Sequence, residues 1–272
     1  MTALATHPAG VATAAPRRAR RFTAYRRFAV PLAILVLWQV LASTGLISAR
    51  TMSSPITIAG SFYALTINGE LLHHLLVSLA RVGVGLAIGV FAGVVFALIA
   101  GLSKAGEDAV DSTLQMVRTL PHLALVPLFI LWFGIGEVPK IALIALGAAF
   151  PIYLNLFSGI RGVDAKVLEA AKTLGLSRAE LITHVILPGA LPSALVGLRY
   201  SLGVAWLSLV VAEQINASSG IGYLVMTARD FLRTDIIFVG LIIYAILGLL
   251  ADQLVRTLER RVLVWRPSFV KD

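Results

Sequence analysis

Long apolar runs decide what this chain can fold into. Of its 272 residues, 58% are hydrophobic and only 14% are charged, which is more apolar surface than a soluble domain of this size needs. Because about 20 apolar residues cross a bilayer as one helix, the chain has room for about six spans and little else. It is therefore predicted to be an all-α, polytopic membrane protein with about six transmembrane helices.

Six apolar runs follow one another along the chain, separated by polar or basic segments such as 102–118. They cover about residues 28–47, 75–101, 120–136, 140–157, 189–211 and 236–254. In the second run, glycine or alanine recurs at every fourth position from Gly85 to Gly101. Small residues at that spacing let another helix approach closely in lipid, so we expect a helix-contact face there.

The third run contains Pro121 and Pro127, which predicts an interrupted helix. Such a break is tolerated at membrane depth where it faces other protein or a cavity, and in transporters it often lies beside the pathway. The sequence leaves open whether this break packs against other protein or lies beside the pathway. His122, next to the break, is a candidate pathway residue, and the alternative is a polar residue near the inner interface.

Basic residues gather just outside the apolar runs. With six spans, both ends of the chain lie on one side of the membrane, and 17 of the 23 Lys and Arg residues lie on that side. This bias predicts cytoplasmic termini. Because the charges flank apolar spans, the net charge of +9 does not indicate a nucleic-acid partner.

The polar segment from Asp164 to Pro188 separates the fourth and fifth runs, and its residues predict two short helices. Asp164 can cap the first helix, and Gly175 suits the left-handed residue at its end. Ser177 and Glu180 have the spacing of a capping box, and Pro188 is expected to end the second helix. The pattern alone leaves two alternatives, an amphipathic element on the lipid surface or a surface that a partner grips.

The same segment resembles the signature loop of ABC-importer permeases. That loop reads Glu-Ala-Ala, three residues, Gly, nine residues, Ile, any residue, Leu-Pro. The matching residues here are Glu169, Ala170, Ala171, Gly175, Val185, Leu187 and Pro188, and Val185 in place of Ile is the one departure. The resemblance extends over about residues 30–267 and is closest to permeases of aliphatic sulfonate importers, within a group that also serves taurine and nitrate. The residues that favour sulfonate are 121–125 (PHLAL) and 184–193 (HVILPGALPS).

The resemblance implies a type I ABC importer permease fold in a bacterial cytoplasmic membrane. Two copies of the chain would form the pathway, with two ATPase subunits beneath them and a periplasmic or lipid-anchored substrate-binding protein outside. The chain itself would bind no cofactor, and ATP-Mg would bind to the ATPase. The coupling contacts implied for this chain are Glu169, Ala170, Ala171, Lys172, Gly175 and Leu176.

The predicted organisation has four parts. Residues 1–27 form a basic cytoplasmic tail, and residues 28–72 the first span with an outer interfacial helix that begins at Ser54-Pro55. Residues 73–256 form the permease core with its coupling loop at 164–188, and residues 257–272 form a second basic tail.

Two charged residues of the fifth run are further pathway candidates. Arg199 stands eleven residues after Pro188, which places it roughly 16 Å into the span, near mid-membrane. It could attract an anionic substrate, or it could lie buried between helices and pair with backbone carbonyls. Glu213 closes the same run at its outer end. Arg81, near the outer end of the second run, is expected to extend to the interface in a structural role.

The sequence lacks the motifs of several kinds of enzyme and metal site. The chain has no phosphate-binding G-x-x-x-x-G-K-[ST] loop, no cysteine and no H-E-x-x-H metal motif, so it is not predicted to be an enzyme. Its acidic residues lie at span ends or in loops, which disfavours an ion-coupled secondary transporter. That carrier and a non-transporting scaffold remain as alternatives.

Overall fold

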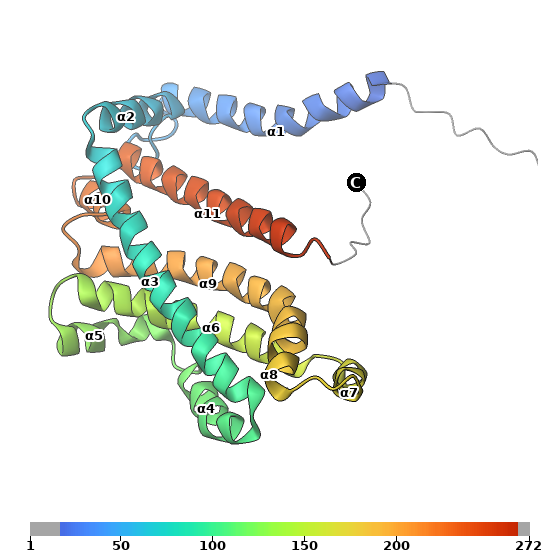
Figure 1. Ribbon diagram of the computed structural model, residues 1–272. Helices are drawn as coiled ribbons and strands as arrows, with labels where there is room; N and C mark the ends of the chain where they lie inside the picture. The colour runs from blue at the N-terminus through green and yellow to red at the C-terminus, as the bar shows by residue number, and fades with distance from the viewer. Residues whose placement is uncertain (1–16, 266–272) are drawn as a thin grey trace, which may run out of the picture. The chain divides into compact units, whose positions relative to one another are not determined.

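The structure is a computed structural model that describes residues 17–265. The chain divides into two compact units, Met1–Thr57 and Ile58–Asp272. All secondary structure of the described part is helical (Figure 1). The helices are α1 (Arg17–Ser43), α2 (Pro55–Ile67), α3 (Glu70–Leu102), α4 (Lys104–Val117), the 3₁₀ helix η1 (His122–Leu125), α5 (Val126–Phe133), α6 (Glu137–Arg161), α7 (Ala165–Thr173), α8 (Arg178–Leu181), the π-helix η2 (Ile182–Ile186), α9 (Leu187–Asn216), α10 (Ile221–Asp230) and α11 (Thr234–Val262).

The first unit holds α1 and the start of α2. Within α1, the apolar stretch Ala29–Ser43 is shorter than a full span. The predicted start of α2 is confirmed, because the helix begins at Pro55 and the Ser54 hydroxyl accepts a hydrogen bond from the Thr57 amide at 3.2 Å. Ser54 thus satisfies one of the free amides at the helix start.

The core of the second unit consists of α3, α6 and α9, with α6 packed between the other two. The predicted small-residue face of α3 is confirmed. A methyl group at Gly85 would lie only 2.6 Å from Ile144 Cγ2, and one at Gly89 would collide with the carbonyl oxygen of Ala145. Both contacts are with α6, so the glycines allow the two helices to approach closely.

A second ridge of small residues lies on α9 and faces α6 from the other side. A methyl group at Gly197 would lie 3.0 Å from the Cα atom of Ile152. Ser201, one turn later, is buried and donates to the carbonyl oxygen of Ala148 at 2.6 Å. These small residues let α9 approach α6 closely.

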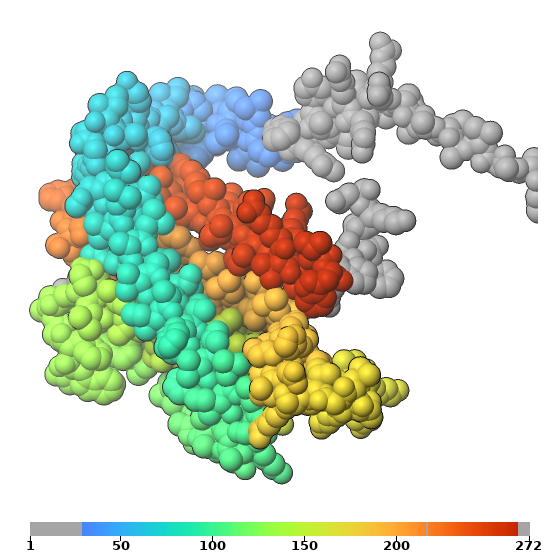
Figure 2. All heavy atoms as spheres, viewed as in Figure 1, coloured from blue at the N-terminus to red at the C-terminus, as the bar shows by residue number. Residues whose placement is uncertain are grey.

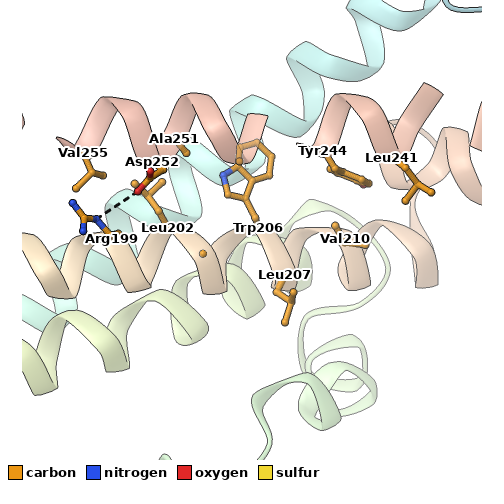
Figure 3. A pocket seen from close by; sticks show the side chains of 12 residues that line it. Arg199, Leu202, Trp206, Leu207, Val210, Leu241, Tyr244, Ala251, Asp252 and Val255 are labelled. Atoms are coloured by element: carbon orange, nitrogen blue, oxygen red, sulfur yellow. Dashed lines mark ion pairs between the residues drawn. The ribbon is translucent and has the colours of Figure 1, made fainter. Parts of the chain in front are cut away.

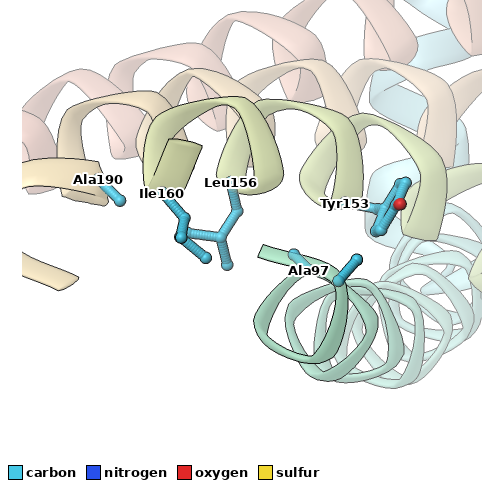
Figure 4. Packing of buried hydrophobic residues seen from close by; sticks show 6 residues of the cluster. Ala97, Tyr153, Leu156, Ile160 and Ala190 are labelled. Atoms are coloured by element: carbon cyan, nitrogen blue, oxygen red, sulfur yellow. The ribbon is translucent and has the colours of Figure 1, made fainter. Parts of the chain in front are cut away.

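One buried cluster joins α3, α6 and α9 at the end of the core where α4, α7 and α8 lie (Figures 1 and 4). Its largest member, Tyr153, is almost fully buried and donates from its hydroxyl to Asp111 Oδ1 at 2.6 Å, which links α6 to α4. The cluster consists of Ala97, Ala100, Tyr153, Leu156, Ile160 and Ala190.

Four described helical segments are long and apolar enough to cross a membrane: Glu70–Leu102, Glu137–Arg161, Arg178–Ile215 and Thr234–Val262. The predicted interruption of the third run is confirmed, because α4 and the η1–α5 segment meet at an angle of 81° and count together as a fifth possible span.

The helix end predicted at Pro188 is wrong. Helix α8 continues through η2 into α9, so that Arg178–Ile215 forms one unbroken helical segment. The π-helical turn lies directly before Pro188, whose ring and missing amide would disrupt a regular α-helix. A wider π turn changes the hydrogen-bond pattern at that point, which lets the helix continue through the proline.

Candidate functional site

The segment from Asp164 to Ile186, called the α7–α8 segment below, stands out from one end of the second unit (Figure 2). Its predicted caps are confirmed. Asp164 Oδ1 accepts from the Lys166 amide at 2.9 Å, and the Ser177 amide donates to Glu180 Oε2 at 2.8 Å while Ser177 Oγ accepts from the Glu180 amide. These bonds hold two short helices in a defined shape at the surface.

Gly175 forms the turn between α7 and α8 and adopts the left-handed φ of +84°. No atom lies within 4 Å of the position that a Cβ would take there, so the requirement for glycine is conformational and not steric. The Leu176 amide donates back to the Ala171 carbonyl at 3.2 Å, which closes the end of α7.

The residues implied as coupling contacts do not all lie on the surface. Glu169, Ala170, Lys172 and Gly175 are exposed, Leu176 is half-buried, and Ala171 is buried. Two further apolar side chains are exposed on the segment, Val167 and, at 81%, Leu174. These two side chains add apolar surface to a segment whose other exposed residues are mostly polar.

The α7–α8 segment continues without a loop into the core helix α9. Because α8, η2 and α9 form one helical segment, a displacement of α8 moves the helix that packs along α6. The geometry therefore permits a partner at the α7–α8 segment to shift a membrane-spanning helix without an intervening hinge loop.

Arg199 lies on α9, at one end of a groove of about 500 Å³ between α9 and α11 (Figure 3). Its Nη2 atom donates to Glu259 Oε2 at 2.7 Å, and its Nε atom lies 3.6 Å from Asp252 Oδ1. Arg256 also pairs with Asp252, at 2.6 Å, so two arginines and two carboxylates balance each other.

These contacts differ from the alternative in which Arg199 pairs with backbone carbonyls, since its partners are side chains of α11. Attraction of an anionic substrate by Arg199 stays a prediction. Its partners Asp252 and Glu259 lie in the second half of α11, which ends in basic residues. The mid-membrane depth expected for Arg199 stays a prediction.

His122 lies in η1, between α4 and α5, and contacts α9. Its Nε2 atom is 3.1 Å from Ser208 Oγ, and Ser208 Oγ donates to the Val204 carbonyl at 2.9 Å. Because the Ser208 proton is already used, His122 Nε2 is assigned as the donor. Among the described residues, no group of three His, Asp or Glu side chains could hold a metal ion.

Comparison with known proteins decides the family. Residues 85–264 match the model of the binding-protein-dependent transport system inner membrane component. This chain belongs to that family. The permease is 49% identical over 250 residues to a protein named as an aliphatic sulfonates transport permease, SsuC, of Bacillus subtilis (92% of this chain, 91% of the relative). It is 50% identical over 240 residues to the protein of the same name in Escherichia coli (88% and 91%).

More distant relatives agree with this assignment. The permease is 38% identical over 239 residues to the taurine transport system permease protein TauC of Escherichia coli (85% of this chain, 86% of the relative). Among solved structures, an amino acid ABC transporter crystallised with histidines matches with a TM-score of 0.62 at 21% identity, covering 73% of this chain and 97% of that one. The permease is thus a multi-pass membrane protein with the type I ABC permease fold, and like its family it is a transport component and not an enzyme.

The permease also contains a buried ionic cluster that the sequence did not reveal. Arg81 of α3 is only 3% exposed and pairs with Glu213 of α9 at 2.7 Å and with Glu137 of α6 at 2.5 Å. It donates in addition to the carbonyl oxygen of Ser219 at 2.6 Å. The prediction that Arg81 extends to the interface is therefore wrong, because partners from three other segments of the permease surround its guanidinium.

Glu213 is fully buried within this cluster. Its carboxylate accepts from Ser78 Oγ at 2.8 Å and from the Gly222 amide at 2.8 Å, besides Arg81. The structure thus gives this pathway candidate no exposed surface and three donors that hold it in place. The signal available from sequence was that three ionisable residues, Arg81, Glu137 and Glu213, all fall at outer span ends.

A further charged contact links α2 to the start of α11 in the second unit. Asp235 Oδ2 accepts from Ser61 Oγ at 2.5 Å and from Arg233 Nη2 at 2.8 Å. The hydrogen bond to Asp235 raises the pKa of Arg233, which lies just before the span. This contact and the Arg81 cluster both lie at the end of the core where α3, α6 and α11 begin.

Proposed function

We propose that this permease forms the membrane pathway for aliphatic sulfonates in an ATP-driven importer. The structural observation that supports this role is the capped and exposed α7–α8 segment, which continues without a break into α9. Such an element transmits force from a soluble partner to the spans. The substrate is proposed from the two relatives at 49% and 50% identity, both named for aliphatic sulfonates.

The working assembly would contain two copies of the permease, two ATPase subunits and a periplasmic or lipid-anchored binding protein. ATP-Mg would bind to the ATPase alone. The distribution of Lys and Arg supports cytoplasmic termini and a cytoplasmic α7–α8 segment. ATP binding would close the ATPase pair, and the gripped α7–α8 segments would turn the spans from inward-open to outward-open.

Taurine is the second candidate substrate, because a relative named for taurine transport is 38% identical. Growth of a deletion strain on single sulfur sources separates the two, with nitrate as nitrogen source tested in parallel. We expect failure on alkanesulfonates and normal growth on taurine, sulfate and nitrate. Failure on taurine or nitrate alone would discard the sulfonate assignment, and uptake that survives loss of the ATPase would indicate an ion-coupled carrier.

A further inference from the structure

A cavity of about 610 Å³ lies between the α7–α8 segment and the ends of α3 and α6. Its apolar wall includes Ile160 of α6, Leu181 of α8 and Ile186 of η2. Three basic side chains, Arg161, Lys172 and Arg178, line the same cavity. The cavity therefore combines hydrocarbon surface with a concentration of positive charge.

Only one of these three basic residues is neutralised by a carboxylate. Arg161 forms an ion pair with Glu107 of α4. Arg178 contacts a backbone carbonyl instead, that of Leu102 at 3.5 Å. In the described part of the chain, neither Lys172 nor Arg178 takes part in an ion pair, although both line the cavity. The cavity thus has excess positive charge that an anionic ligand would balance.

The position of the cavity indicates what kind of anion this is. The apolar helices α3 and α6 end at Leu102 and Arg161, and both residues line the cavity. The ends of apolar spans mark the level of the phospholipid headgroups. A basic pocket at that level, next to apolar side chains, has the chemistry of a site for an anionic lipid headgroup.

We propose that this cavity binds the headgroup of an anionic phospholipid, with its phosphate at Lys172 and Arg178 and its glycerol end against the apolar wall. The two basic residues lie on either side of the Gly175 turn, one on α7 and one on α8. A phosphate between them would tie the two short helices together and to the span ends. The lipid would thus position the α7–α8 segment that the proposed function assigns to the ATPase.

The test uses the full-length permease in mild detergent, titrated with dioleoyl phosphatidylglycerol or dioleoyl phosphatidylcholine and followed by native mass spectrometry. We expect retention of phosphatidylglycerol over phosphatidylcholine and weaker retention at high salt. For the double variant K172Q/R178Q we expect affinity to fall about fivefold per charge removed, which corresponds to about 1 kcal/mol for each basic residue.

The matched control is K104Q/K166Q, which removes two exposed lysines that do not line the cavity. An equal loss of phosphatidylglycerol in both double variants would overturn the proposal. Equal retention of the two lipids by the unmodified permease would also overturn it, and that comparison needs no variant to fold. Displacement of the lipid by millimolar inorganic phosphate would show a site for small anions instead. Native mass spectrometry measures bound lipid and does not depend on transport. These results are therefore independent of the sulfonate assignment.

Discussion

Arg81 Nη1 donates to Glu213 Oε1 at 2.7 Å, and the two side chains are 3% and 0% exposed. The two residues are 132 positions apart and join α3 to α9. Removing Glu213 leaves Arg81 buried with Glu137 as its one remaining carboxylate partner, which is destabilising, whereas removing both charges costs less.

We therefore expect Glu213→Gln to destabilise the permease by about 1–3 kcal/mol. Thermal unfolding in detergent measures this effect. The double variant R81Q/E213Q should lose less than the sum of the two single variants, because the pair is removed as a unit. Asp230→Asn is the control, since Asp230 and its partner Arg229 are 63% and 62% exposed and the loss of this pair should cost about 1 kcal/mol or less. If the loss in R81Q/E213Q equals the sum of the losses in R81Q and in E213Q, the coupling is contradicted.

The close contact of α3 with α6 predicts a contrast between two glycines of one helix. Gly89→Ala would force a methyl group into the carbonyl oxygen of Ala145, and we expect a loss of about 1–3 kcal/mol from overpacking. Gly83→Ala is the matched control, because nothing lies within 4 Å of its Cβ position and alanine favours the helix. Similar unfolding temperatures for the two variants would argue against the packing seen between α3 and α6.

Gly175 should be needed for docking rather than for membrane insertion. Gly175→Val places a β-branched residue at φ +84°, which costs about 1–2 kcal/mol in local backbone energy and reshapes the turn. We expect normal amounts of the variant in the membrane but reduced co-purification of the ATPase. Gly175→Asn, which tolerates the left-handed conformation, should retain docking. Unchanged co-purification with Gly175→Val would refute a docking role for this turn.

The ion pair between Arg199 of α9 and Glu259 of α11 predicts similar uptake when either partner is replaced. The side chains of Arg199 and Glu259 are 39% and 38% exposed, so solvent screens the pair and its loss should cost about 1 kcal/mol or less. We expect R199Q and E259Q to reduce uptake to a similar degree if the pair only holds the helices together. Uptake measured over a range of sulfonate concentrations checks this. A rise in apparent KM confined to R199Q would instead indicate direct contact of Arg199 with the anion.

The features that the sequence predicted correctly are those that residues close together in the chain determine. The caps at Ser54 and Ser177, the left-handed Gly175 and the break around Pro121 each depend on a few consecutive residues. The ridge from Gly85 to Gly101 follows from helical periodicity. Hydropathy and periodicity therefore predicted the contact faces and the shape of the α7–α8 segment, whereas of the six predicted spans the described residues show four, or five with the bent pair.

Only the tertiary structure decided which charged groups meet. Arg81 with Glu137 and Glu213, and Arg199 with Glu259, are separated by 56 to 132 residues in the chain, and no local pattern encodes these pairs. The π turn before Pro188 likewise depends on how the α7–α8 segment joins α9, since proline by itself predicts a helix end. Side-chain partners in a membrane core are set by how separate helices converge, and that convergence is a property of the packed fold alone.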